Sequence, residues 1–325
     1  MNGLIKHIIS VSFTTTICLV IIDIVFQESK ILSGFYSTLD TELGMIPRSE
    51  FNTYYYNEGF GISYYQSEQF PIFNPNKNET WNIYGDSFIE AQQVFQRHHF
   101  AVLLSKTRNV SIRNLGQSGM NLESMFSRYF ATKDKFPAQK HIFFISSDDF
   151  DSDDIGHYLA LPNFSSDDSL ITKCNFNYKN GNKEKTERIL KNSGIYMLAK
   201  KDFNQIRNKN VSKILFGKFS FWVEEKHESN TDYQTFNSKR IATLLQLLKK
   251  EKDVIFVFRG QKMISNEYNF IFSNAKIEFL NLQNQMTELE QKNNTNFLYH
   301  KVTKQSGHWN KAGHLAVSKI LSHEL

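Results

Sequence analysis

The chain has 325 residues, which is enough for one large domain or two small ones. Hydrophobic residues make up 40% and charged residues 22%, so the chain can bury a core. The net charge is +5, and lysine and arginine are scattered rather than clustered, which excludes a basic nucleic-acid-binding surface. Cys18 lies in the apolar N-terminal stretch and Cys174 stands alone beyond it, so neither a disulfide outside the membrane nor a zinc site is expected.

An apolar segment near the N-terminus, residues 8–26, predicts a membrane anchor. As a helix it would span roughly 28 Å, just enough for the hydrocarbon core of a bilayer. Lys6 and His7 precede it, which favours a cytoplasmic N-terminus, and Asp23 lies near the outer end. A cleaved signal peptide is the alternative, but the apolar stretch is too long and no convincing cleavage site follows. We therefore expect residues 1–27 to anchor the chain in the inner (cytoplasmic) membrane, with the remainder periplasmic or otherwise extracytoplasmic.

Residues 28–79 form a lead segment rich in aromatic side chains. These are Phe35, Tyr36, Tyr54, Tyr55, Tyr56, Phe60, Tyr64, Tyr65, Phe70 and Phe73. Because aromatic rings bury large apolar areas, the simpler interpretation is that they pack onto the following domain. The alternative is that some of them form a wall on which sugars stack.

From residue 80 onward, predicted strands alternate with predicted helices. Strands are predicted at 81–85, 109–116, 141–146 and 254–258, with shorter candidates at 276–280 and 296–300. Helices are predicted at 90–105, after the N-cap Asn121, around 241–248 and at 311–323. Residues 151–235 are polar and irregular and are interpreted as an insertion. The alternation predicts an α/β domain over residues 80–325 with a mostly parallel sheet, whose ligand site lies at the carboxyl ends of the strands.

Residues suited to acyl-transfer chemistry follow the predicted strands. Ser87 lies in "WNIYGDSFIE", and a serine hydroxyl becomes a nucleophile when a base takes its proton. His308, in "SGHWNKAGH" just before the last helix, is the candidate base, whereas His314 and Asn310 are interpreted as packing and capping residues. The glycine turn "NLGQSGMN" at residues 114–121 opens onto a helix N-terminus, where backbone N–H groups could hold an oxyanion.

Together, "GDSF", "NLGQSG", "SSDDF" and "GHWN" resemble the SGNH (GDSL-like) hydrolase superfamily. With the upstream "NEGFG", they are most similar to its membrane-anchored members associated with bacterial exopolysaccharide and surface-glycan acetylation. The resemblance implies a three-layer α/β/α sandwich, flavodoxin-like, with a mostly parallel five-stranded sheet. It also implies that Ser87 is the nucleophile, that Ser87 and Gly119 donate N–H groups to the oxyanion, and that His308 is the base.

Two positions depart from the pattern of that family. Asp148 stands where an asparagine amide would be the third oxyanion donor, and an ionised carboxylate only accepts hydrogen bonds. Ser306 stands where an aspartate would orient His308 and stabilise its cation. The acidic run at Asp148, Asp149, Asp151, Asp153 and Asp154 lacks the glycine and distal glutamate of an EF-hand, so we expect a solvated loop and no metal.

The sequence therefore favours an enzyme that acts on acyl esters, with acetyl the expected group, of a cell-surface polysaccharide. It would be a serine esterase or O-acetyltransferase with a Ser87–His308 dyad and no cofactor. Expected partners are an acylated polysaccharide or oligosaccharide, the membrane, and a membrane acyl-transfer or glycan-assembly protein, but no nucleic acid. The alternative is a catalytically degenerate domain that binds glycan or assists polysaccharide assembly, which Asp148 and Ser306 favour.

Overall fold

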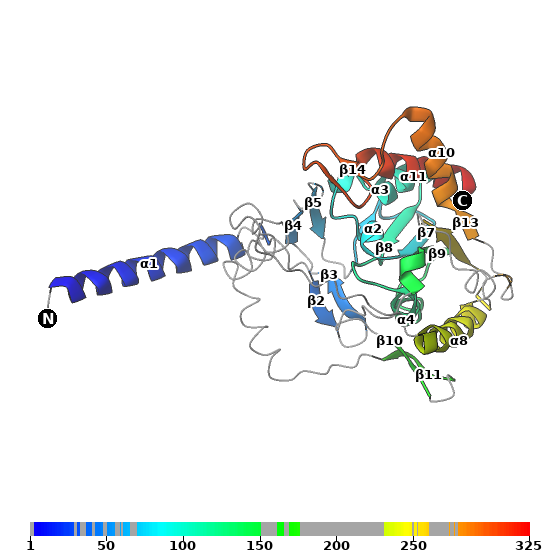
Figure 1. The fold of residues 1–325 in the computed structure, drawn as a ribbon, viewed down its shortest axis with the longest axis horizontal. Helices are drawn as coiled ribbons and strands as arrows, with labels where there is room; N and C mark the ends of the chain where they lie inside the picture. The colour runs from blue at the N-terminus through cyan, green and yellow to red at the C-terminus, as the bar shows by residue number, and fades with distance from the viewer. Residues whose placement is uncertain are drawn as a thin grey trace.

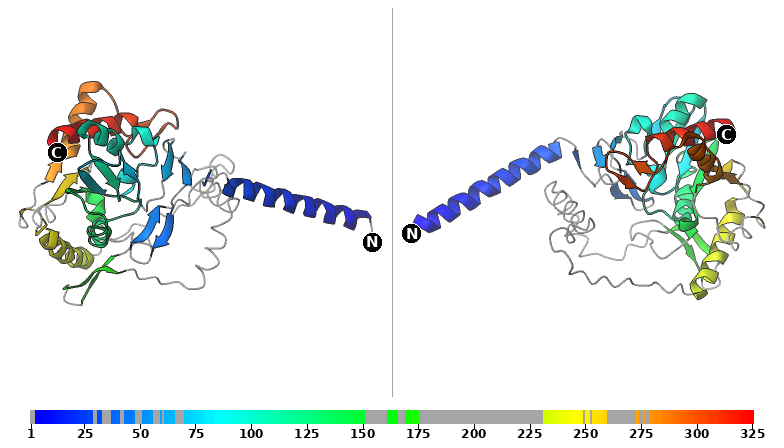
Figure 2. Two further views of the ribbon diagram at one scale, coloured as in Figure 1. Left: turned by 180° about the vertical axis from the view of Figure 1, so that it is seen from behind. Right: turned by 45° about the horizontal axis from the view of Figure 1, so that its top comes forward.

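The computed structural model describes residues 3–28, 31–32, 37–40, 43–47, 51–55, 59, 61–65, 70–150, 161–165, 169–175, 231–248, 250–251, 253–259, 273, 276 and 279–325. They form a mixed α/β domain, from which helix α1, Gly3–Glu28, extends outward (Figures 1 and 2).

A six-stranded sheet in the order β13-β12-β9-β7-β8-β6 lies at the centre of this domain. Its strands are β6 Ile72–Phe73, β7 Thr80–Tyr84, β8 Ser111–Asn114, β9 Lys140–Ile145, β12 Val254–Phe258 and β13 Phe279–Asn281. Five strands are parallel, as predicted, and β6 adds an antiparallel edge beside β8. The chain moves from β7 outward to β8 and then returns to the other side of β7 to form β9. The strand order therefore reverses at the carboxyl ends of β7 and β9, where ligands bind in open α/β sheets.

Helices cover both faces of the sheet. They are α3 Phe100–Arg108, α4 Leu122–Thr132, α8 Thr231–Leu248, α10 Leu282–Asn293 and α11 Lys311–Glu324. Side chains alternate along each strand, so Ile142 and Phe144 of β9 join the core formed with α3, α10 and α11. Phe143 and Ile145 point the other way and join the core formed with α4 and α8. The domain is therefore a sheet between two helical layers.

Two of the predicted elements differ in the structure. The helix expected at 90–105 is correct over residues 100–105 and wrong before them: helix α2, Ser87–Glu90, ends at Ala91 in the left-handed conformation, and α3 begins only at Phe100. His99 starts α3 because its Nδ1 accepts the Ala101 N–H at 3.0 Å. The predicted strand at 296–300 yields β14, Tyr299–His300, which pairs with β15, Gln305–Ser306, and not with the central sheet.

The interval predicted as an insertion, 151–235, contains one described antiparallel pair, β10 Leu161–Phe164 and β11 Leu170–Asn175. Helix α8 begins near its end, at Thr231. Phe164 and Leu170 pack against the core on the α4 side. The rest of the interval lies outside the described residues.

The lead segment forms two small sheets and contributes to both cores. One sheet joins β1 Ile31–Leu32, β4 Phe51–Tyr55 and β5 Gly61–Tyr65, and β2 Ser37–Asp40 pairs with β3 Gly44–Pro47. Phe70 and Phe73 are buried in different cores, which confirms the packing interpretation for these two rings. Phe35, Tyr36, Tyr56 and Phe60 lie outside the described residues, and the sugar-stacking alternative stays a prediction.

Residues 8–26, the predicted anchor, lie within α1. Among the described residues, no helix combines the length and apolarity needed to cross a membrane.

Candidate active site

Ser87 lies on a tight turn between β7 and α2. The Asp86 side chain caps α2 by accepting the Phe88 N–H at 3.0 Å, and the Asp86 carbonyl accepts the N–H groups of Ile89 and Glu90. Gly85 is required at the strand end, because a Cβ there would lie 2.2 Å from Ile89 Cγ1. The turn that presents Ser87 is therefore specified by its immediate neighbours in sequence.

His308 meets Ser87 from the far end of the chain. Its Nε2 lies 2.6 Å from Ser87 Oγ, although the two residues are 221 positions apart. Asn310 fixes the loop behind His308, because its Oδ1 accepts the Ala312 and Gly313 N–H groups and so caps α11. The His308 carbonyl lies 3.1 Å from His300 Nε2, which donates to it. The structure thus brings the predicted nucleophile and base into hydrogen-bond contact.

The glycine turn lies beside the Ser87 turn. The Gln117 N–H donates to the Gly85 carbonyl at 2.9 Å, and the Met120 N–H closes the turn on the Gln117 carbonyl at 3.2 Å. Gly119 has φ +80°, the conformation that a type II turn requires at its third position. Gly119 is exposed, and neither its N–H nor that of Ser87 has a hydrogen-bond partner among the described residues.

Two buried side chains hold this turn in place. Glu90, at the end of α2, accepts hydrogen bonds from both the N–H and the hydroxyl of Ser118. Asn114 accepts the Gly116 N–H at 2.9 Å and donates to the Ile89 carbonyl at 2.7 Å. Both bridges connect the glycine turn to α2, the helix that starts with Ser87, so the two turns are positioned as one unit.

The two positions that depart from the resembled pattern lie in different elements. Asp148 lies in η2, Ser147–Phe150, directly after β9 and so at the same sheet edge as Ser87. Ser306 is exposed in β15, opposite Tyr299. The roles assigned to both positions stay predictions.

The prediction of a solvated loop is wrong at Asp149. It is buried, and one carboxylate oxygen accepts the N–H and the hydroxyl of Ser146 at 2.6 and 3.0 Å. Burial, together with the nearby Asp86 carboxylate, raises the pKa of Asp149. Asp151, Asp153 and Asp154 lie outside the described residues.

Sequence reasoning missed Arg259, which follows β12 at the same edge. It forms an ion pair with Asp86 and lies 3.8 Å from Asp149. Its Cζ lies 4.1 Å from the centre of the Phe88 ring. The available signal was an arginine directly after the apolar run "VIFVF", at a strand end that a parallel sheet brings near Ser87.

Two other histidines, His99 and His314, are buried in the core. His314 is buried and its Nδ1 accepts the Phe100 N–H at 3.2 Å, which confirms it as a packing residue. His99 accepts the Ala101 N–H and donates from Nε2 to the Ile89 carbonyl at 2.9 Å. Burial lowers the pKa of His99 to about 4 and that of His314 well below its usual value, so both rings are neutral.

A polar hollow lies at the opposite edge of the sheet. It has a volume of about 400 Å³ and is lined by residues 76–79 and 108–110, which precede β7 and β8. Since it adjoins the amino ends of these strands, it is separate from the Ser87–His308 pair.

No protein-family model matches the sequence, and no curated protein matches it. Solved structures that resemble the chain include GDSL-like hydrolases and esterases. A member of the lipolytic G-D-S-L family from Desulfitobacterium hafniense is 11% identical with a TM-score of 0.36, covering 76% of this chain and 100% of that one. The acetylxylan esterase Axe2 from Geobacillus stearothermophilus is 10% identical with a TM-score of 0.36, covering 78% and 96%. Similarities this weak do not identify an activity, so the case for one rests on the site.

Proposed function

We propose that the chain is a serine esterase or O-acetyltransferase that acts on acetyl esters of a cell-surface polysaccharide. The observation that carries the proposal is the 2.6 Å contact between Ser87 Oγ and His308 Nε2, because it pairs a hydroxyl with a base able to take its proton. The polysaccharide substrate is proposed from the sequence resemblance alone.

The proposed reaction has two steps. His308 Nε2 takes the Ser87 proton as Oγ attacks the acyl carbonyl, and the resulting oxyanion accepts hydrogen bonds from the Ser87 and Gly119 N–H groups. Collapse of the intermediate breaks the ester bond, and the His308 proton passes to the leaving sugar oxygen. Water or a second sugar hydroxyl then attacks the acyl-serine, with His308 again as base, and restores Ser87. Hydrolysis results in the first case and transfer in the second.

The rival is a degenerate domain that binds glycan or assists polysaccharide assembly without turnover. Asp148 favours it, because an ionised carboxylate at the expected third-donor position would repel an oxyanion. Ser306 favours it as well, because a serine cannot balance the charge of the imidazolium.

The location we propose is the inner membrane, with the catalytic domain on the periplasmic side and residues 1–27 as anchor. The apolarity of residues 8–26 and the preceding Lys6 and His7 support this proposal. A membrane acyl-transfer or glycan-assembly partner would then deliver the acyl group or the acceptor.

The test is hydrolysis of an activated acetyl ester by the purified full-length protein. Turnover that is lost in Ser87→Ala and in His308→Ala, and kept in Ser322→Ala, supports the serine mechanism. Ser322 is a matched control, because its hydroxyl donates to the Lys319 carbonyl within its own helix, α11. If the native protein is inactive and Ser306→Asp, alone or with Asp148→Asn, gains activity, the degenerate domain is the correct interpretation. Acetylated product on added oligosaccharides would distinguish transfer from hydrolysis.

A further inference from the structure

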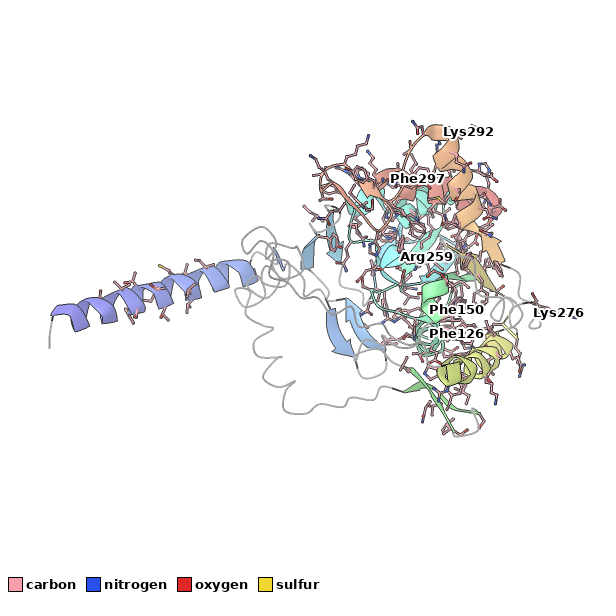
Figure 3. All side chains as sticks on the ribbon, in the orientation of Figure 1. Phe126, Phe150, Arg259, Lys276, Lys292 and Phe297 are labelled. Atoms are coloured by element: carbon pink, nitrogen blue, oxygen red, sulfur yellow. The ribbon has the colours of Figure 1, made fainter. Side chains whose placement is uncertain are left out.

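A buried ion cluster lies directly behind the Ser87 turn. Arg259 pairs with Asp86 across 173 positions of sequence and lies 3.8 Å from the Asp149 carboxylate. The Arg259 side chain is only 5% exposed, and Figure 3 labels it within the outline of the domain. Its backbone N–H donates to the Ile145 carbonyl at 2.8 Å, which ties it to the end of β9. A side chain so enclosed is not placed to bind substrate.

Asp86 connects this cluster to the nucleophile. One carboxylate oxygen, Oδ1, accepts the Phe88 N–H and caps α2, while the other, Oδ2, is held by Arg259. With both oxygens engaged, the Asp86 side chain has one orientation. Because Asp86 immediately precedes Ser87, that orientation determines how the turn presents the Ser87 hydroxyl.

Phe88 connects the same cluster to the base. The Arg259 guanidinium lies 4.1 Å from the centre of the Phe88 ring. The Phe88 ring in turn lies 4.5 Å from the His308 ring, centre to centre, and 5.1 Å from that of Trp309. A planar cation on an aromatic ring is a directional contact. Arg259 therefore limits the positions open to the ring that supports His308.

Stability alone does not account for an arginine at this place. A buried ion pair loses much of its attraction to the cost of desolvation, and an apolar side chain of similar volume often stabilises a fold equally well. Arg259 Nε is also buried and has no hydrogen-bond partner among the described residues, which adds to that cost. The arginine contacts Asp86 and the Phe88 ring at the same time, through an ion pair and a cation–ring contact. An apolar residue could not make both contacts.

We infer that Arg259 is a positioning residue that aligns Ser87 through Asp86 and His308 through Phe88. Its catalytic consequence rests on the proposed function, whereas the alignment itself is a property of the fold. Loss of the arginine should lower kcat and leave KM unchanged, because the substrate does not contact it.

The test compares Arg259→Met with the native full-length protein on an activated acetyl ester. A misplacement of about 1 Å costs about a hundredfold, so kcat should fall about a hundredfold, with KM changed less than about twofold. Arg259→Lys keeps a positive charge for Asp86 but loses the planar group above Phe88, so its kcat should fall about tenfold. Recovery of part of the activity by lysine is not expected of a side chain that only fills space.

The chain offers a matched control in Arg113 of β8. Arg113 is partly buried, its Cζ lies 4.6 Å from the centre of the Phe136 ring, and its guanidinium donates to Asn82 Oδ1 at 3.5 Å. Arg113→Met should keep kcat within about twofold of the native value, since the ring that Arg113 contacts is Phe136 rather than Phe88, and distant sites act independently. A folded Arg259→Met protein with the kcat of Arg113→Met would overturn the inference. If Arg259→Met does not fold, Arg259→Lys is compared with Arg113→Lys in the same way.

Crystal structures separate this inference from the proposed function. If the native protein has no esterase activity, the proposed function fails, and the alignment is then judged from the Ser87 Oγ to His308 Nε2 distance. Loss of the 2.6 Å contact in Arg259→Met or Arg259→Lys, but not in the matched Arg113 variant, supports the inference. An unchanged contact overturns it.

Discussion

Replacing Gly85 with alanine should destabilise the fold through one identifiable clash. A Cβ at this position would lie 2.2 Å from Ile89 Cγ1, 3.0 Å from Ile89 Cβ and 3.3 Å from Phe144 Cβ. Ile89 is fully buried, and the Asp86 cap fixes the start of its helix. A rotamer change could move Ile89 Cγ1 but not its Cβ, so rotation alone cannot relieve the contact. Overpacking of this kind typically costs about 1–3 kcal/mol of unfolding free energy, and we expect a loss in that range.

The size of the effect can be checked against Ile89 itself. Ile89→Ala removes the atom that clashes most closely and should by itself cost about 2–5 kcal/mol, because it leaves a cavity. In the double variant, the methyl group added at position 85 no longer meets Cγ1 and partly fills that cavity. The double variant should therefore be more stable than the sum of the two single changes predicts, by about 1–3 kcal/mol.

The assay is denaturant unfolding of the four proteins in the double-mutant cycle, with stability taken from the midpoint at an unchanged slope. Gly119→Ala is a matched control, because a Cβ there meets nothing within 4 Å and only the φ of +80° opposes it. It should cost about 1–2 kcal/mol through backbone strain, with no coupling to Ile89→Ala. Additivity of Gly85→Ala and Ile89→Ala within about 0.5 kcal/mol would refute the reasoning.

Three further predictions concern single side chains. Asp148→Asn would supply a third oxyanion donor and should raise kcat about a hundredfold, and unchanged ester hydrolysis would contradict that role. Burial lowers the pKa of His99 to about 4, so its contribution to stability is complete above pH 6.5 and is lost as pH falls through 4. The loss due to His99 should reach about 3 kcal/mol, so His99→Gln should lose about 3 kcal/mol less than the native protein between pH 7 and 4, and parallel stability curves for the two proteins would argue against it. Asn114→Ala leaves the buried Gly116 N–H without its acceptor and should cost about 1–3 kcal/mol in denaturant unfolding; a change below about 0.5 kcal/mol would show that the turn is held by other contacts.

The elements that depend on local pattern were predicted correctly. The apolar period after Asn121 predicted α4, and the Asn121 side chain caps it by accepting the Ser124 N–H. The apolar runs at β7, β9 and β12 predicted buried strands of a parallel sheet. The helix predicted at 90–105 was correct from residue 100 onward and wrong before it, because its residues allow a continuous helix locally, whereas the structure ends α2 at Ala91 and caps α3 at His99. That choice depends on contacts with the rest of the fold.

By itself, the sequence determined which residues carry reactive groups and that each follows a strand. Ser87 on its Gly-Asp turn, the glycine turn at 114–121 and His308 before the last helix could all be named from short motifs. Only the tertiary structure decided that Ser87 and His308 lie 2.6 Å apart, that Asp149 is buried, and that Arg259 reaches Asp86. The reason is that a motif specifies its own backbone, whereas the distance between motifs depends on strand order and on which core each helix joins. Those are properties of the whole packed chain.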